Sequence, residues 1–141
     1  MRGMPLTIHG NGCNMRNFLH CEDVARAFEL LLFKGVVGEI YNIGGSNEFR
    51  NIDVAKKILD SMWDDIKDNC DGKTKDDMII FVEDRNFNDF RYHITSEKLK
   101  SLGWNEEITF EDGLKQTIEW YKDNTNRYPD IENALRAHPK F

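Results

Sequence analysis

An apolar run at residues 78–82 (MIIFV) constrains the fold of this chain more than any other feature. A strand with this pattern has no polar face, which is typical of a strand buried between two layers in a helix-covered parallel sheet. A stretch rich in carboxylates, aromatic rings and arginines follows at residues 83–92. The sequence therefore predicts a buried strand that delivers a charged loop at its end.

Other short runs have the composition of strands. Residues 5–9 and 18–20 are expected to be extended, and the simplest interpretation is two strands joined by the turn at residues 10–12 (GNG). Residues 39–43 (EIYNI) are a further β-leaning run and end at Gly44 and Gly45. We expect three or four short strands in all.

Amphipathic helices separate these runs. Residues 24–32 place apolar side chains on one helical face after Asp23, and Gly35 is expected to end this helix. Residues 54–63 repeat the pattern, with Asn51 as the candidate cap. A short helix is expected at residues 95–102, before Gly103. A capping box at residues 109–112 predicts a last helix that runs to about residue 124.

This alternation predicts an α/β fold with an incomplete, at least partly parallel sheet. Three or four short strands make a thin sheet, so the chain has the pattern of part of a larger fold. Residues 64–77 are polar and acidic and are expected to form an exposed, non-catalytic connection. We expect one region at residues 1–126 and a loosely docked or partly disordered extension at residues 127–141.

Composition narrows the class of protein. The 141 residues carry a net charge of -6, which opposes general nucleic-acid binding because no basic face is available. No apolar run approaches the roughly 18 residues of a membrane span, and residues 1–5 lack a secretory apolar core. The expected location is therefore the cytosol, with no membrane partner.

The cysteines, histidines and large aromatic residues are predicted to have ordinary structural roles. Three cysteines without Cys-x-x-Cys spacing predict free thiols rather than a disulfide framework or a zinc site. The histidines share no metal-ligand spacing, so no metal site is expected. Trp104, Trp120 and Tyr121 are interpreted as packing groups rather than a stacking platform for nucleic acid.

The charged loop supplies the strongest functional signal. Arg85 and Arg91 lie in it, and Arg16 lies far upstream after the glycine turn. A guanidinium group binds phosphate oxygens two at a time through its forked N–H donors, which favours a diphosphate ligand. Surface ion pairs are the alternative, because carboxylates surround both loop arginines.

The chain resembles the C-terminal part of the nucleotide-sugar 4,6-dehydratases, which are extended short-chain dehydrogenase/reductase enzymes of Rossmann type acting on dTDP-glucose or UDP-glucose. The likeness covers nearly the whole chain. It rests on these motifs in order: residues 5–10 (PLTIHG), 16–19 (RNFL), 22–25 (EDVA), 38–45 (GEIYNIGG), 84–85 (DR), 88–89 (ND), 91–92 (RY), 102–104 (LGW) and 117–121 (TIEWY).

The resemblance implies a substrate-binding set. Residues 4–9 are similar to the segment beside the nucleotide base, Arg16 and Arg85 match arginines that bind the diphosphate, and Asn51 matches an asparagine at the nucleotide. Asn86 and Asn88 stand where bacterial members have proline and histidine, a departure that leans toward the UDP-glucose dehydratases of the rhamnose pathway. The implied residues are Met4, Pro5, Leu6, Thr7, Ile8, His9, Arg16, Asn51, Asp84, Arg85 and Asn88.

The family's catalytic apparatus has no counterpart in this sequence. Members hold NAD with a Gly-x-x-Gly-x-x-Gly turn at a helix start, and that spacing does not occur here. They also use a Tyr-x-x-x-Lys pair as the base, and none of the four tyrosines is followed by lysine four positions later. We expect no catalytic residue in this chain, no NAD bound to it alone, and no reaction without the missing N-terminal half.

Three interpretations of function follow. The chain is a C-terminal part of a 4,6-dehydratase that needs an N-terminal partner, a stand-alone module that binds a nucleotide sugar, or an inactive remnant with exposed apolar surface that aggregates. A related sugar-nucleotide epimerase or decarboxylase is the alternative enzyme family, because these enzymes share the fold and many of the C-terminal sequence motifs. Uracil and thymine are not distinguished.

Overall fold

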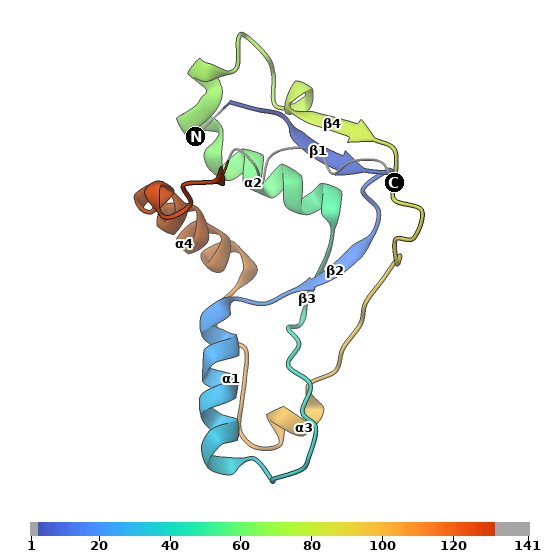
Figure 1. Cartoon of the computed structure of the whole chain (residues 1–141), viewed down its shortest axis with the longest axis vertical. Helices are drawn as coiled ribbons and strands as arrows, with labels where there is room; N and C mark the ends of the chain where they lie inside the picture. The colour runs from blue at the N-terminus through green and yellow to red at the C-terminus, as the bar shows by residue number, and fades with distance from the viewer. Residues whose placement is uncertain (1–2, 132–141) are drawn as a thin grey trace.

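The computed structural model describes residues 3–131 of the chain. Figure 1 shows an elongated molecule in which β1, β4 and α2 form one end and α1 and α3 form the other, with β2 and β3 between them. The elements, in chain order, are β1 (Leu6–His9), β2 (Met15–Phe18), α1 (Cys21–Lys34), β3 (Asn47–Arg50), α2 (Asn51–Ile66), η1 (Lys67–Asn69), η2 (Asp76–Met78), β4 (Ile79–Val82), α3 (Glu97–Lys100), α4 (Phe110–Asp123) and η3 (Thr125–Arg127).

The strands form two small sheets. β1 pairs with β4 in parallel, with Ile8 opposite Phe81, and β2 pairs with β3 antiparallel, with Arg16 opposite Phe49. The glycine turn therefore separates two sheets instead of closing a hairpin, which corrects the simplest interpretation of residues 5–20. Gly10 and Gly12 both have positive φ, of 62° and 71°, and allow the chain to change direction there.

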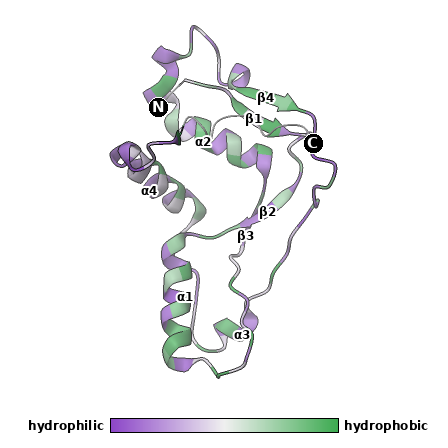
Figure 2. Ribbon diagram, viewed as in Figure 1, coloured by the Kyte–Doolittle hydropathy of each residue, from purple (hydrophilic) through white to green (hydrophobic). Residues whose placement is uncertain are grey.

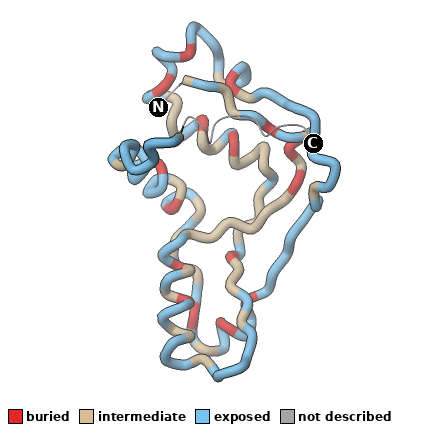
Figure 3. Tube along the Cα trace, in the orientation of Figure 1, coloured by how far each residue is buried: buried red, intermediate tan, exposed pale blue. Residues whose placement is uncertain are grey.

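Two small clusters of buried apolar residues form the cores of the two ends of the molecule, and Figure 3 shows where the chain is buried. At the sheet end, α2 packs on the β1–β4 sheet through the buried residues Leu59, Ile66, Cys70 and Met78. At the other end, α1 packs with α3 and the following loop through Ala27, Leu99 and Trp104. Burial of these side chains is the main stabilising term at each end.

The burial of β4 differs from the prediction. The strand forms at Ile79–Val82, but Ile80, Phe81 and Val82 are 43%, 58% and 38% exposed. The two-stranded sheet is covered by α2 on one side, and no further layer among residues 3–131 covers these side chains. Figure 2 shows this apolar strand at the outer edge of the molecule.

Residues 39–43 form no strand, although their composition predicted one. Ile40 is 82% exposed in this segment, and nearby Val37 is fully exposed. A strand forms only where a neighbour supplies the ladder hydrogen bonds, and none of the described strands lies against this segment.

Local signals predicted the helices well. α1 ends before Gly35 and α4 ends at Asp123, as expected, and Thr109 Oγ1 accepts a hydrogen bond from the Asp112 N–H. Asn51 is not a cap, because it is the first residue of α2 and Arg50 holds the cap position without a side-chain bond.

Two further predictions are corrected in part. The short helix near residue 97 is limited to Glu97–Lys100. Residues 64–77 are not a simple exposed connection, because α2 continues to Ile66, and Ile66 and Cys70 are buried. The predicted extension at residues 127–141 lies mostly outside the described residues.

Candidate functional site

The arginine loop begins at the carboxyl end of β4. Because β1 and β4 are parallel, the turn after β1 lies beside it, and the Gly10 N–H donates to the Val82 carbonyl at 2.9 Å. Ligands of α/β proteins commonly bind at the carboxyl ends of parallel strands. The two segments predicted to carry the site therefore meet at one edge of this sheet.

Arg16 and Arg85 converge on a single acceptor. Asn88 Oδ1 accepts from Arg16 Nη2 at 3.3 Å and from Arg85 Nη2 at 3.1 Å. Arg16 lies on β2 and Arg85 in the loop after β4, so the fold brings together guanidinium groups 69 positions apart in sequence. Two cations that share one amide oxygen form a site suited to an anion with several oxygens.

Asp84 fixes the shape of the loop. Its Oδ1 accepts from the Arg85 main-chain N–H and from Asn88 Nδ2, both at 2.8 Å. A Cβ added to Gly10 would lie 2.7 Å from Asp84 Oδ2, so this carboxylate occupies the space that the glycine leaves. Asp84 thus orients Asn88 and the start of the loop.

Arg16 is held by several groups at once. Its Nη1 donates to the Met15 carbonyl at 2.6 Å and its Nη2 to the Asp89 carbonyl at 2.9 Å. Its guanidinium carbon lies 4.8 Å from the centre of the Tyr92 ring. The side chain is half-buried and its orientation is largely fixed before any ligand arrives.

Arg91, the second arginine of the loop after β4, connects this loop to the β2–β3 sheet. Arg91 donates to both carboxylate oxygens of Glu48, at 2.6 and 2.7 Å, and the Met15 N–H donates to the Phe90 carbonyl at 2.8 Å. The hydrogen bond from Arg91 lowers the pKa of Glu48. Arg91 therefore makes a two-bonded ion pair, which is the alternative that the sequence left open for it.

The other sequence-predicted residues lie along two elements. Pro5 precedes β1, whose Leu6 is half-buried and whose Ile8 is 8% exposed, while Thr7, His9 and the preceding Met4 are exposed. Asn51 donates its main-chain N–H to Asn14, two residues before Arg16. The structure thus joins Arg16, Asp84, Arg85 and Asn88 directly, and places Asn51 beside them without a contact to either arginine.

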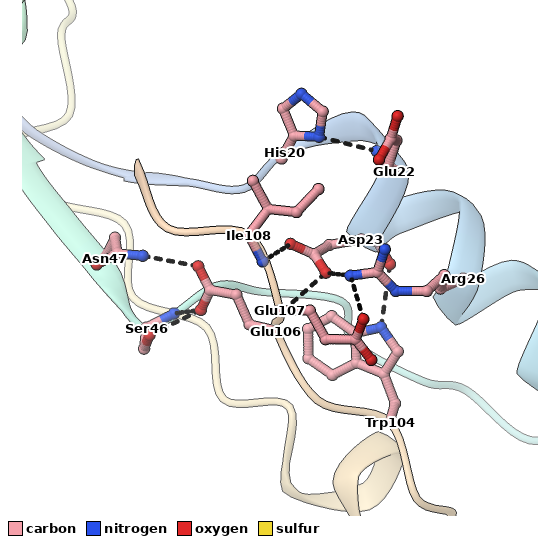
Figure 4. Close-up of polar contacts among 10 residues, drawn as sticks. All are labelled: His20, Glu22, Asp23, Arg26, Ser46, Asn47, Trp104, Glu106, Glu107 and Ile108. Carbon is pink, nitrogen blue, oxygen red and sulfur yellow. Dashed lines mark hydrogen bonds and ion pairs between the residues drawn. The ribbon is translucent and has the colours of Figure 1, made fainter. Parts of the chain in front are cut away.

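A buried carboxylate was missed by the sequence reasoning. Asp23 is fully buried and accepts from the N–H groups of Glu107 and Ile108 at 3.0 and 3.1 Å (Figure 4). It also pairs with Arg26, and its carbonyl accepts from Trp104 Nε1 at 3.0 Å. Asp23 stands before an apolar helix face and within the motif at residues 22–25 (EDVA), but its partners, 84 and 85 positions away, give no local signal in the sequence.

Glu106 makes the matching connection to β3. Its carboxylate accepts from the Ser46 N–H, the Ser46 hydroxyl and Asn47 Nδ2, each at 2.7 Å (Figure 4). Together, Asp23 and Glu106 hold residues 104–108 between α1 and the start of β3. The contacts of these two carboxylates join parts of the fold, and none of their hydrogen bonds involves Arg16 or Arg85.

A hollow of about 320 Å³ lies elsewhere, between α1 and residues 103–107, and is lined by Phe33, Trp104 and Arg26 among others. The arginine cluster instead lies on an open surface. We place the candidate site at the cluster, because two guanidinium groups converge there on one acceptor, whereas the hollow is lined by both cationic and acidic side chains.

The described part of the chain carries neither a metal-binding cluster nor a membrane-spanning helix. Residues 3–131 contain no group of three or more His, Cys, Asp or Glu side chains placed to hold a metal ion. None of the helices in this part of the chain is long and apolar enough to span a bilayer. All three cysteines are free, as predicted.

Known proteins are similar to this chain in sequence and in fold. The family model described as GDP-mannose 4,6 dehydratase matches residues 2–117. The trifunctional UDP-glucose 4,6-dehydratase/UDP-4-keto-6-deoxy-D-glucose 3,5-epimerase/UDP-4-keto-L-rhamnose-reductase of Arabidopsis thaliana is 47% identical over 141 residues, which is 100% of this chain and 20% of the relative.

Solved structures of dehydratases and epimerases are similar to this chain in fold. The dTDP-glucose 4,6-dehydratase of Bacillus anthracis, in complex with NAD, is 41% identical with a TM-score of 0.74, over 88% of this chain and 36% of that one. The UDP-glucose 4-epimerase of Thermotoga maritima, with UDP-glucose, is 26% identical with a TM-score of 0.74, over 88% and 37%.

The chain thus spans between a fifth and just over a third of these proteins. Its small parallel sheet and helices are part of the Rossmann-type, extended short-chain dehydrogenase/reductase fold that the resemblance implied. The family match covers far more than half of the 141 residues. This chain belongs to the nucleotide-sugar 4,6-dehydratase family.

Proposed function

We propose that this chain is the nucleotide-sugar-binding portion of a 4,6-dehydratase and that Arg16 and Arg85 bind the diphosphate of its ligand. One observation carries the proposal: both guanidinium groups donate to the same Asn88 oxygen. Like charges converge in this way only when a shared acceptor offsets their repulsion. A diphosphate would supply such acceptors with full negative charge.

The Asn88 oxygen marks where a phosphate oxygen would bind. An ionised acceptor forms shorter and roughly twofold stronger hydrogen bonds with guanidinium than a neutral amide does. Phosphate would therefore displace the amide oxygen from one or both arginines, and Asn88 Nδ2 would remain bound to Asp84. Asn88 can also donate to a ligand if that bond opens.

The nucleoside would lie along β1. Residues 4–9 run toward the arginine cluster, with Met4, Thr7 and His9 exposed, and Asn51 begins α2 next to the segment that carries Arg16. The proposed ligand is UDP-glucose or dTDP-glucose. The names of the Arabidopsis and Bacillus proteins support these two donors, and the higher identity to the plant protein favours UDP-glucose.

Dehydration itself would need a second polypeptide segment. We propose that NAD and the Tyr-x-x-x-Lys base are supplied by an N-terminal portion, since neither motif occurs here. The exposed apolar residues of β4 and of residues 28–40 support contact with such a portion, because surfaces of this kind are typical of interfaces. Residues 1–126 would form the binding region, with 127–141 as its extension.

Calorimetric titration of the chain with UDP and with dTDP tests the proposal. Arg85→Ala should weaken binding roughly 10- to 150-fold, because it removes charge-assisted hydrogen bonds worth about 1.5–3 kcal/mol. Arg127→Ala is the matched control, since this exposed arginine lies on η3 and packs over Trp120. Equal affinities of wild type and Arg85→Ala would overturn the assignment.

An epimerase is the second candidate. The Thermotoga neighbour has the same arrangement of elements at the same TM-score as the Bacillus dehydratase. Diphosphate binding would be identical in both enzymes, so titration does not separate them. Reconstitution with an N-terminal portion would, because a dehydratase gives a 4-keto-6-deoxy sugar and an epimerase a C4 epimer.

A further inference from the structure

We propose that Tyr92 is a positioning residue that fixes the Arg16 guanidinium group for the ligand. The inference rests on the proposed function, because it concerns the same diphosphate. Neither the family match nor the resemblance assigns a role to this tyrosine. Its ring lies under Arg16, with the guanidinium carbon 4.8 Å from the ring centre.

A guanidinium group over an aromatic face is held by the ring quadrupole. Tyr92 then occupies one side of the Arg16 guanidinium group, and the N–H groups remain available to other acceptors. Three such hydrogen bonds are already made, to the Met15 carbonyl, to Asn88 Oδ1 and to the Asp89 carbonyl. The ring thus favours the rotamer in which Arg16 donates to the same Asn88 oxygen as Arg85.

Asp89 anchors the ring. The Tyr92 hydroxyl donates to the Asp89 carboxylate, which raises the pKa of Tyr92 and keeps its hydroxyl protonated. The Asp89 carbonyl accepts from Arg16 Nη2 at 2.9 Å and from Asn14 Nδ2 at 3.2 Å. Asn14 is itself buried, at 6% exposure, so the tyrosine and the arginine share one fixed point.

Tyr92 is 50% exposed, which argues against a role in the apolar core. Truncating it should therefore leave the two core clusters intact. Its removal would free the Arg16 side chain to sample other rotamers, and a ligand would then have to order it on binding. The expected loss in affinity is several-fold to about 30-fold, the range of a partly desolvated cation–π contact.

The test compares Tyr92→Leu, which removes the aromatic face, with Tyr92→Phe, which keeps it. We expect Tyr92→Leu to bind UDP roughly tenfold more weakly and Tyr92→Phe to stay within about threefold of wild type. Tyr128→Leu is the control for loss of an exposed tyrosine, since Tyr128 contacts Trp120 and Tyr121 away from this loop. Circular dichroism verifies that each variant is folded.

A double-mutant cycle separates positioning from direct contact. If Tyr92 acts through Arg16, then Tyr92→Leu adds no loss in the Arg16→Ala background. Equal losses in both backgrounds would overturn the inference, because the ring would then contribute without the arginine.

Proton NMR of the ligand-free chain distinguishes failure of this inference from failure of the proposed function. The Arg16 side-chain protons should show upfield ring-current shifts in wild type and Tyr92→Phe, and not in Tyr92→Leu. Absence of these shifts in wild type would refute the positioning role, whatever binds. Their presence in a chain that binds neither UDP nor dTDP would instead refute the proposed function alone.

Discussion

Asp23→Asn tests whether one buried carboxylate holds the first turn of α1 and residues 104–108 together. Asp23 has no exposed surface and accepts from two main-chain N–H groups through separate oxygens. Asparagine has the same shape but only one accepting oxygen. Its NH₂ group would face an N–H donor of Glu107 or Ile108, and the Arg26 guanidinium would keep only Glu107 of its two anionic partners.

The magnitude follows from these contacts. A hydrogen bond to a charged group contributes about 1.5–3 kcal/mol, and removing one partner of a buried ion pair costs about 3–5 kcal/mol. These terms overlap, so we expect Asp23→Asn to lower the free energy of unfolding by about 3–5 kcal/mol. For a domain of ordinary stability, about 5–15 kcal/mol, that is a large fraction of the total.

Urea denaturation followed by tryptophan fluorescence measures the effect, because the Trp104 indole donates to the Asp23 carbonyl. With an m-value of about 2 kcal/mol/M, the midpoint should fall by roughly 2 M. Asp53→Asn is the matched control, since Asp53 pairs with Arg50 at the surface and its loss should move the midpoint little. If the midpoint of Asp23→Asn falls by less than about 0.5 M, the proposed role of this carboxylate is refuted.

Three more predictions concern the loop and the exposed surface. The hydrogen bond from Arg91 lowers the pKa of Glu48, so this pair should stabilise the chain at pH values above the ordinary glutamate pKa of about 4.3. This stabilisation should be lost as the pH falls below that pKa. Urea midpoints measured from pH 6 to 3 should therefore fall less steeply in Glu48→Gln than in wild type, and parallel profiles would contradict the pairing. Gly10→Ala should weaken UDP binding several-fold in calorimetry, because its Cβ would displace Asp84, whereas Gly72→Ala, with similar positive φ but open space, should not. Exposed apolar surface favours self-association, and Phe33 is 78% exposed, so Phe33→Lys should lower the fraction of dimers and larger species in sedimentation velocity. An unchanged fraction would show that this surface does not drive self-association.

The parts of the fold that depend on neighbouring residues in sequence were predictable. Thr109 and Asp112 are three positions apart, and their hydrogen bond and the helix that follows appeared as expected. The periodicity of α1 and its end at Gly35 were likewise local signals. Asn51 shows the limit, because its side chain has a capping composition but the helix begins one residue earlier than that role requires.

The sequence indicated candidate site residues, whose role in binding stays a prediction, but it did not indicate their arrangement. The sequence indicated Arg16, Arg85 and Asn88 as ligand-binding residues, but nothing in it showed that one amide oxygen joins both arginines. Glu48 was not singled out, since its pairing with Arg91 spans 43 positions and depends on how the loop returns to β3. Such pairings are set by tertiary packing and leave no periodic trace in the chain.

Two of the wrong predictions about strands, the burial of β4 and a strand at residues 39–43, have the same physical explanation. The run at β4 is apolar on both faces, yet three of its side chains are substantially exposed, and residues 39–43 have strand composition without a strand. Composition reflects the environment in which a segment is stable, whereas a strand also needs a neighbour for its N–H and C=O groups. We attribute both discrepancies to a missing neighbouring layer, which agrees with a chain that covers about a third of its solved relatives. If an N-terminal portion of such a relative is added, amide exchange should slow at residues 39–43 and 79–82 together, and exchange that stays fast at both would refute this explanation.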